Sequence, residues 1–303
     1  MKILLLGAGG HLGWELARSL QPLGEVVAVD RTRADLSRPA SLHASVDSVA
    51  PDVIVNAAAY TAVDRAEEES ELAFAINARA PGELAQAARR TGALLVHYST
   101  DYVFDGAGGA PHDECAPTAP LNCYGRSKLA GEQAVAAAGA DWLVLRTSWI
   151  YAARGRNFLR TILRLAAERE RLEVVADQIG APTSARLVAD ATAQIVAKAA
   201  IERAGGRFSS ELLHLCAAGA VSWHAFAQAI VAGWRARAGN DALVVREIVP
   251  IASSEYPTAA PRPLDARLDC TRVRERFALH LPDWQEGMKL VLDELATEPA
   301  RVR

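Results

Sequence analysis

The chain has 303 residues, of which 50% are hydrophobic and 23% are charged. This ordinary balance can build a core and excludes disordered, collagen-like and small disulfide-stapled classes. The 33 Lys and Arg residues against 36 Asp and Glu residues give a net charge of −3, so we expect no nucleic-acid or membrane partner. The apolar runs are far shorter than the roughly 18 residues that span a bilayer. The four cysteines are scattered and form no CxxC pair, which argues against zinc and for reduced thiols in the cytoplasm.

Five short, almost continuously apolar runs in the first half predict strands that helices cover on both faces. These runs are 3–6, 26–29, 53–55, 94–96 and 143–145. Longer stretches typical of helices stand at about 11–21, 40–49, 67–91 and 124–138. This β-α-β-α order predicts an α/β fold with a Rossmann-type, doubly wound parallel sheet and right-handed crossovers.

The pattern changes after residue 150. Predicted helices near 156–170, 186–203, 222–238 and 284–296 are separated by short apolar runs and proline-containing loops. We therefore expect a sheet domain over residues 1–150 and a smaller C-terminal α/β part over residues 151–303. Some later segments are expected to return to the first sheet.

A glycine-rich turn, GAGGHLG, follows the first predicted strand. Gly7 suits the tight turn, Gly10 lets the backbone approach a pyrophosphate, and Gly13 permits close contact between helix and strand. The helix that begins there would offer unpaired N–H groups to phosphate oxygens. The pattern therefore predicts that residues 1–150 bind NAD(P), and a merely structural turn is the weaker alternative.

The second predicted strand ends at Asp30, whose carboxylate could accept hydrogen bonds from the adenosine ribose and so favour NADH. Arg31 and Arg33 follow, and they could instead hold the 2′-phosphate of NADPH or simply be solvated. The sequence leaves NADH and NADPH open for this reason. Asp35 and Leu36, an acid followed by an apolar residue, are expected at the adenine.

Tyr124 and Lys128 stand four residues apart in a predicted helix and so share one face of it. A free tyrosine has a pKa of about 10, which a nearby ammonium would lower by favouring the phenolate. The pair could then move a proton to or from an oxygen while a hydride moves at the carbon. Thr100 follows the fourth predicted strand and could reach the same site. An exposed helix start is the ordinary alternative for such a pair.

Four further segments add to these motifs: NAAAYTAVD at 56–64, STDYVFDG at 99–106, RTSWIY at 146–151 and DQIGAPT at 177–183. Together they resemble the extended short-chain dehydrogenase/reductases and, within them, the dTDP-4-dehydrorhamnose reductase family, over about residues 1–295. The resemblance implies an NAD(P)H-dependent oxidoreductase. Its reaction would be reduction of the 4-keto group of dTDP-4-dehydro-6-deoxy-L-mannose to dTDP-L-rhamnose, the last step in the synthesis of that nucleotide sugar.

The resemblance also implies roles for individual residues. Tyr124 would donate the proton, Lys128 would bind the nicotinamide ribose, and Thr100 would hydrogen-bond the substrate oxygen. The dinucleotide would be lined by Gly7, Gly10, His11, Leu12, Gly13, Asp30, Asp35, Leu36, Ala59, Tyr60, Thr61, Tyr98, Tyr124 and Lys128. The substrate would be bound by Thr100, Asp101, Trp149, Asn157 and Arg262.

Two of these substrate residues also have a chemical rationale. The flat apolar face of Trp149 suits the C–H face of a deoxysugar, and the Arg262 guanidinium fits the oxygens of a diphosphate. A plain core position for Trp149 and an ordinary loop position for Arg262 are the alternatives.

One position departs from the family pattern. The resemblance implies metal-bridged dimers that use several glutamates, and Glu15 fits one of them, whereas Arg186 stands where another is expected. A cation there opposes magnesium, and an Arg186–Glu15 ion pair could replace the ion. We therefore predict no metal site, no magnesium requirement, and a monomer or weak homodimer.

Two other functions stay open. One is a 4-ketoreductase or epimerase for another dTDP-deoxysugar, with the single acid of Thr100-Asp101-Tyr102 favouring simple reduction over dehydration. The other is a non-catalytic NAD(P)-binding regulatory subunit, which the presence of both Tyr124 and Lys128 disfavours. In the reductase interpretations the partner is a small nucleotide sugar.

Overall fold

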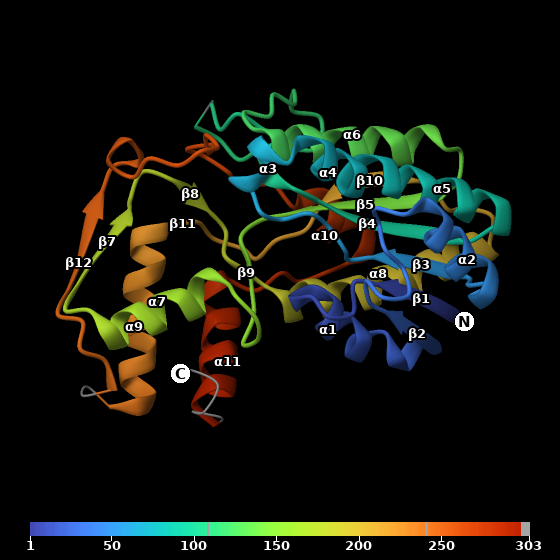
Figure 1. Ribbon diagram of the computed structural model, residues 1–303. Coiled ribbons are helices and arrows are strands. Elements are labelled where there is room, and N and C mark those ends of the chain that lie inside the picture. Colours follow the sequence, from blue (N-terminus) through green and yellow to red (C-terminus); the bar gives the residue numbers. More distant parts are fainter. Residues whose placement is uncertain (108, 240–241, 298–303) are drawn as a thin grey trace.

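The computed structural model describes residues 1–107, 109–239 and 242–297. A six-stranded sheet with the order β10-β5-β4-β3-β1-β2 forms its larger part, and every neighbouring pair is parallel (Figure 1). The strands are β1 (Lys2–Leu6), β2 (Glu25–Val29), β3 (Val53–Asn56), β4 (Leu94–Thr100), β5 (Asp141–Thr147) and β10 (Glu211–His214). The predicted doubly wound α/β fold is confirmed.

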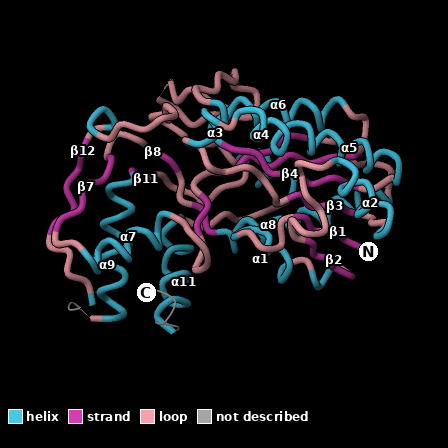
Figure 2. Tube along the Cα trace, in the orientation of Figure 1, coloured by secondary structure: helices cyan, strands magenta, loops and turns pink. Residues whose placement is uncertain are grey.

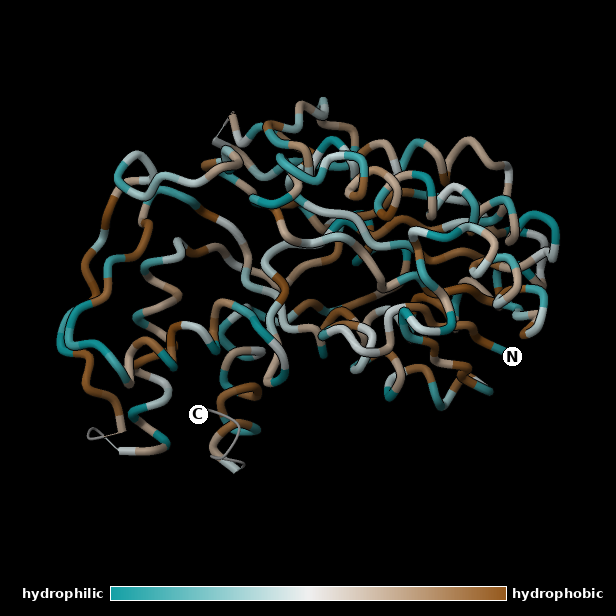
Figure 3. Tube along the Cα trace, viewed as in Figure 1, coloured by the Kyte–Doolittle hydropathy of each residue, from teal (hydrophilic) through white to brown (hydrophobic). Residues whose placement is uncertain are grey.

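Helices cover both faces of this sheet, which explains why its strands are apolar at consecutive positions. Ile3 and Leu5 of β1 join a core with α1 (His11–Ser19) and α8 (Ala185–Ala204). Leu4 and Leu6 point to the other face, where α2 (Pro39–Val49) and α5 (Ala80–Thr91) contribute the core and α6 (Cys123–Ala137) packs beside α5. Figure 3 shows the hydrophobic residues of β1 next to the N-terminus.

The predicted helix at 67–91 is interrupted. It consists of α3 (Arg65–Glu68), α4 (Ser70–Phe74), a π-helical turn η2 (Ala75–Arg79) and α5. Pro81 stands in the first turn of α5, and a proline cannot donate the hydrogen bond that would continue a helix through it. The turn η2 also packs closely on α6, because a Cβ on Gly131 would lie 2.0 Å from the carbonyl oxygen of Asn77.

A smaller part, at the left in Figure 2, has its own core. Its helices are α7 (Phe158–Glu168), α9 (Trp223–Ala238) and α11 (Trp284–Thr297). Its short strands pair two by two: β7 (Arg171–Val175) with β12 (Glu247–Ile251), β8 (Ile179–Gly180) with β11 (Val221–Ser222), and β6 (Ile150–Tyr151) with β9 (Thr183–Ser184).

Three segments after residue 150 return to the larger part. They are α8, β10 and the short helix α10 (Thr271–Phe277). The sequence pattern did not predict α10. Val188 and Ile195 of α8 and Val273 of α10 belong to the same core as β1. The larger part is thus built from residues on both sides of position 150. Short 3-10 turns described in the structure include η1 (Gln21–Leu23), η3 (Asp101–Val103) and η5 (Ser253–Glu255). Within the described residues, we find no helix with the length and apolar character to cross a membrane.

Candidate active site

The glycine turn lies at the carboxyl edge of the sheet, between β1 and β3, where the strand order reverses. Ligands of doubly wound sheets bind at such a point. Gly7 has a φ of +86°, and a Cβ on it would lie 2.7 Å from the nitrogen of Ala58. A Cβ on Gly13 would lie 2.0 Å from the carbonyl oxygen of Gly7. Both positions therefore require glycine.

The N-terminus of α1 fits a phosphate group. Its N-cap residue is Gly10, and no side chain caps the first turn, so the backbone N–H groups there lack a side-chain acceptor. A Cβ on Gly9 would meet no atom within 4 Å, which leaves open space beside the turn. The partly buried His11 packs against Gly155 of the smaller part, and burial lowers the pKa of its imidazole.

Asp30 lies exposed just beyond β2. Its carboxylate accepts hydrogen bonds from the backbone nitrogen and the hydroxyl of Thr32, which lower its pKa. Asp35 is held in the same way by Ser37 and lies 3.7 Å from the Arg31 guanidinium. Leu36 is 6% exposed and packs in the core, so a contact with the adenine would have to use its backbone.

The segment after β3 runs beside the glycine turn. Ala59 and Tyr60 are half-buried and Thr61 is exposed. The Tyr60 backbone nitrogen donates to Asn77 at 2.8 Å, and its hydroxyl donates to Glu69 at 2.6 Å. These contacts hold the backbone of this segment at the edge of the sheet.

Tyr124 lies in the first turn of α6, where Asn122 caps the helix by accepting a hydrogen bond from Gly125 at 2.8 Å. Thr100 ends β4, and its hydroxyl is a hydrogen-bonding neighbour of the Tyr124 phenol. Burial raises the pKa of Tyr124 to about 12, and the Thr100 hydrogen bond opposes this rise. The ring of Tyr102 packs edge-to-face on Tyr124, with 5.8 Å between the ring centroids.

Lys128 is buried one turn further along α6. Its ammonium donates to the carbonyl oxygen of Tyr98 at 2.6 Å and lies 3.4 Å from the His97 imidazole. Burial lowers the pKa of Lys128 to about 8. The expected lowering of the Tyr124 pKa by this ammonium is wrong in this structure, because burial of the phenol dominates and Lys128 points at the β4 backbone.

Asp101 lies next to Thr100 and is 2% exposed. It accepts hydrogen bonds from the Thr100 hydroxyl at 2.9 Å and the Ser148 hydroxyl at 2.8 Å. Burial raises the pKa of this carboxyl to about 6, against the lowering effect of these hydroxyls. The three side chains form a buried network behind Tyr124.

Trp149 has a φ of +45°, in the left-handed region that non-glycine residues rarely adopt. Its ring stacks on Trp223 of α9, with 3.4 Å between centroids and 5° between planes. A Cβ on Gly180 would lie 2.5 Å from this ring. Trp149 is half-buried. Its stack with Trp223 makes it one member of an aromatic pair that joins the two parts of the chain.

Three other predicted site residues have structural partners. Asn157 caps α7, and its amide nitrogen donates to the carbonyl oxygens of Ala152 and Arg154. The Arg262 guanidinium forms a fork with the Asp64 carboxylate, with both contacts at 2.7 Å. The Tyr98 side chain is buried on the far face of the sheet, with its hydroxyl 2.8 Å from that of Thr192 on α8. Protein contacts alone therefore explain the positions of these three side chains.

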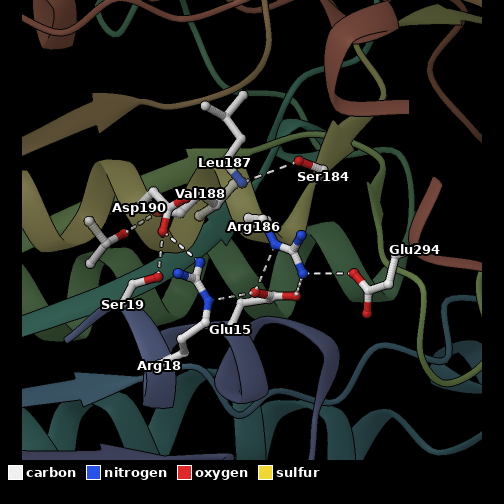
Figure 4. Close-up of polar contacts among 10 residues, drawn as sticks. Glu15, Arg18, Ser19, Ser184, Arg186, Leu187, Val188, Asp190 and Glu294 are labelled. Carbon is white, nitrogen blue, oxygen red and sulfur yellow. Dashed lines mark hydrogen bonds and ion pairs between the residues drawn. The ribbon is translucent and has the colours of Figure 1, made fainter. Parts of the chain in front are cut away.

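Arg186 and Glu15 form the ion pair that the sequence suggested. The guanidinium contacts Glu15 at 3.2 Å and Glu294 of α11 at 2.7 Å, so one cation links α1, α8 and α11 (Figure 4). Arg18 reaches the same Glu15 carboxylate at 3.3 Å. Among the described residues there is no cluster of three or more His, Cys, Asp or Glu side chains suited to a metal ion.

A family model described as the RmlD substrate binding domain matches residues 1–297. The dTDP-4-dehydrorhamnose reductase of Burkholderia thailandensis is 54% identical over 298 residues, which cover 98% of this chain and 100% of that protein. The chain belongs to the dTDP-4-dehydrorhamnose reductase family. The family member from Escherichia coli K12 is 46% identical over 99% of this chain and 100% of its own length.

Solved structures agree with this family assignment. The dTDP-4-dehydrorhamnose reductase of Bacillus anthracis, solved in complex with NADP, superposes with a TM-score of 0.86 at 34% identity, over 97% of this chain and 99% of that one. The UDP-glucose 4-epimerase of Thermus thermophilus, in complex with NAD, has a TM-score of 0.77 at 19% identity, over 97% of this chain and 98% of its own. This second likeness shows a shared fold.

Three further side chains lie at this site, and the sequence did not predict roles for them there. Ser148 holds Asp101, Tyr102 packs on Tyr124, and His97 lies between Lys128 and Asn56. Ser148 and Tyr102 stand inside the quoted motifs, so their positions carried a signal. His97 stands inside a buried strand and carried none beyond its polarity.

Proposed function

We propose that this chain catalyses the NAD(P)H-dependent reduction of the 4-keto group of dTDP-4-dehydro-6-deoxy-L-mannose to dTDP-L-rhamnose. The observation that carries the proposal is the position of Tyr124 against Thr100 at the carboxyl edge of the sheet, beside an uncapped glycine turn. The relatives that match this chain over their full length are named for this reductase activity.

In the proposed mechanism, Tyr124 is the proton donor. A phenol whose pKa is raised to about 12 stays protonated at neutral pH and can give its proton to an oxygen that gains charge. In the structure the Thr100 hydroxyl donates its single proton to Asp101 at 2.9 Å, and in the proposal it turns to donate that proton to the same substrate oxygen when the substrate binds. When bound, the nicotinamide supplies the hydride.

The other predicted residues take positioning roles in this proposal. Lys128, fixed on the Tyr98 carbonyl, holds the nicotinamide ribose with its remaining N–H groups. Trp149 offers its ring to the sugar, and Arg262 is placed for the diphosphate by its fork with Asp64. Gly7, Gly10 and Gly13 position the turn for the dinucleotide phosphates.

We propose that both NADH and NADPH serve as the reductant. Asp30 favours NADH, because its ionised carboxylate would repel a 2′-phosphate. Arg31 and Arg33 are exposed beside it and offset this repulsion, and the Bacillus anthracis relative was solved with NADP. We further propose a cytoplasmic monomer or weak homodimer that takes a nucleotide sugar and neither nucleic acid nor a membrane.

The test is incubation with enzymatically prepared dTDP-4-keto-6-deoxysugars and NADPH or NADH, followed by chromatographic identification of the product. Formation of dTDP-L-rhamnose with oxidation of the cofactor supports the proposal. A different dTDP-deoxysugar as the main product would favour the alternative 4-ketoreductase. Cofactor binding without turnover, equal in wild type and Tyr124→Phe, would favour a regulatory subunit.

A further inference from the structure

Two of the four cysteines lie against each other although 54 positions separate them in the sequence. The Sγ atoms of Cys216 and Cys270 are 3.4 Å apart. Cys216 follows β10 and is 2% exposed, whereas Cys270 caps α10 and is partly exposed. The other two cysteines differ: Cys115 is exposed, and Cys123 is buried beside Ser70. The sequence, which suggested four separate thiols, gave no sign of this pair.

A surface pocket borders the pair on one side, and Cys270 is the more exposed of the two thiols. A surface pocket of about 480 Å³ has both Cys216 and Cys270 in its lining, together with Arg267, Arg274 and Asp269. None of its lining residues is Thr100, Tyr124 or Lys128, so it is separate from the candidate active site. Arg267 is paired with the Asp265 carboxylate at 2.8 Å, so Arg274 and Asp269 are the remaining charged groups of the lining.

The pair also touches the segment that carries the active-site network. Cys216 packs in one cluster with Val103 and Phe104, which lie two and three residues after Asp101 in the chain. A disulfide has an S–S length of about 2.05 Å, so bond formation would draw the two sulfurs together by roughly 1.3 Å from their present 3.4 Å. Such a movement would be transmitted to the turn after β4, because the cluster is buried and closely packed.

We propose that Cys216 and Cys270 form a reversible disulfide by exchange with a low-molecular-weight disulfide in this pocket, and that the bond slows turnover at the neighbouring active site. The partly exposed Cys270 attacks one sulfur of the small disulfide, forms a mixed disulfide and expels one small thiolate. Cys216 then attacks the Cys270 sulfur, and the second small thiolate leaves. Two protein thiols are oxidised, one small disulfide becomes two thiols, and the two cysteine protons pass to them.

In the reduced protein, the hydrogen bond with Cys270 and burial raise the pKa of the Cys216 thiol. This hydrogen bond is lost once Cys270 carries the small thiol. It then no longer raises the pKa of Cys216, so the Cys216 thiolate forms more easily and can attack the Cys270 sulfur. Cytosolic disulfides are typically transient and redox-sensing, which fits a bond that forms by exchange.

The test uses glutathione disulfide as the probe, with non-reducing peptide mapping by mass spectrometry. Wild type should form the 216–270 cross-link, and dithiothreitol should reverse it. Cys216→Ser should trap one glutathione at Cys270, whereas Cys270→Ser should leave the buried Cys216 free. The double variant Cys115→Ser/Cys123→Ser is the matched control and should still form the cross-link.

Exposed Cys115 reports that the probe is active. Glutathione on Cys115 of wild type without a 216–270 cross-link would overturn the proposal, and this result needs no variant to fold. Turnover, which rests on the proposed reductase activity, should fall between roughly 3-fold and 100-fold in the cross-linked protein and recover with dithiothreitol. Unchanged turnover in a fully cross-linked, active enzyme would refute the coupling, whereas absence of activity in the reduced protein would refute the proposed function instead.

Discussion

Lys128 donates its hydrogen bond to the backbone of β4, at the carbonyl oxygen of Tyr98, over 2.6 Å. The side chain of Tyr98 lies on the opposite face of the sheet, where its hydroxyl contacts Thr192 of α8. The ammonium is thereby fixed by a strand rather than by the phenol of Tyr124. An ammonium held in this way keeps its position whatever the protonation state of Tyr124.

Replacing Tyr124 by Phe removes the proposed proton donor but keeps the ring that packs on Tyr102. We expect kcat to fall by roughly 10²–10⁴, the usual contribution of a general acid. Cofactor affinity, measured by the fluorescence of bound NADPH, should stay close to that of wild type. Turnover within a few-fold of wild type would remove Tyr124 from the mechanism.

Asp30→Ala should shift cofactor preference toward NADPH, because an exposed, ionised carboxylate at the end of β2 repels a 2′-phosphate. The measurement is the ratio of kcat/KM for NADPH and NADH. Asp35→Ala is the matched control, since the Asp35 carboxylate is held by Ser37 and lies near Arg31. An unchanged ratio in Asp30→Ala would show that Asp30 does not face the ribose.

Trp149→Ala should raise the apparent KM for the nucleotide sugar without changing cofactor affinity. It should also lower the melting temperature, because the ring stacks on Trp223. Trp223→Ala breaks the same stack from the other side and serves as the control for stability. A loss of about 3–5 kcal/mol with unchanged kinetics would mean that Trp149 is simply a core residue.

Asp101 should make the stability of the protein depend on pH. Its carboxyl has a pKa of about 6 in the folded chain against 3.8 for the ordinary group, so folding favours the protonated form. That stabilisation is complete below pH 3.8 and is lost as the pH rises through 6. Relative to Asp101→Asn, wild type should therefore lose roughly 2–3 kcal/mol of unfolding free energy between pH 4 and pH 7.

Urea unfolding of wild type and Asp101→Asn at a series of pH values measures this difference. The other carboxyl groups titrate in both proteins and largely cancel in the comparison. Stability curves that stay parallel across the range would contradict the raised pKa of Asp101.

Chelation should leave this protein unchanged. Arg186 puts a fixed cation between Glu15 and Glu294, where a magnesium ion would need carboxylates. We expect EDTA to alter neither turnover nor the sedimentation coefficient. A dimer that dissociates with EDTA and reforms with Mg²⁺ would contradict this.

The same cluster offers a stability test. Arg186→Gln should cost about 1 kcal/mol of unfolding free energy, because its guanidinium is partly exposed and solvent screens the two ion pairs. Arg18→Gln is the comparison, since Arg18 is more exposed and contacts Glu15 at 3.3 Å and Asp190 at 2.7 Å. Equal melting temperatures for Arg186→Gln and wild type would show that the ion pairs of Arg186 with Glu15 and Glu294 do not stabilise the folded protein.

The fold was largely predictable, because the period of the apolar residues is a local signal. The runs at 3–6 and 94–96 correspond to β1 and β4, and the helix expected at 186–203 corresponds to α8. The seven-residue α10 was missed, because a short helix without a capping side chain leaves no periodic pattern. The break before Pro81 was missed although the proline itself is a signal for it.

The sequence predicted which residues form the candidate site, but not the contacts that hold their side chains in place. Spacing placed Tyr124 and Lys128 on one helix face, but it could not tell that the ammonium would find the Tyr98 carbonyl. The partners of Arg262 and Trp149 come from Asp64 and Trp223, and sequence distance hides such pairings. Side-chain contacts across the fold depend on packing that one sequence does not display.

The return of α8 to the sheet affects how the chain is made. Leu16 and Leu20, on and just after α1, share a core with Val188 and Ile195, which the ribosome adds about 170 residues later. Until α8 emerges, α1 is the only helix of this core that can cover this face of the growing sheet, so part of the face stays exposed. A nascent polypeptide that pauses near residue 180 would therefore expose apolar side chains that the finished protein buries.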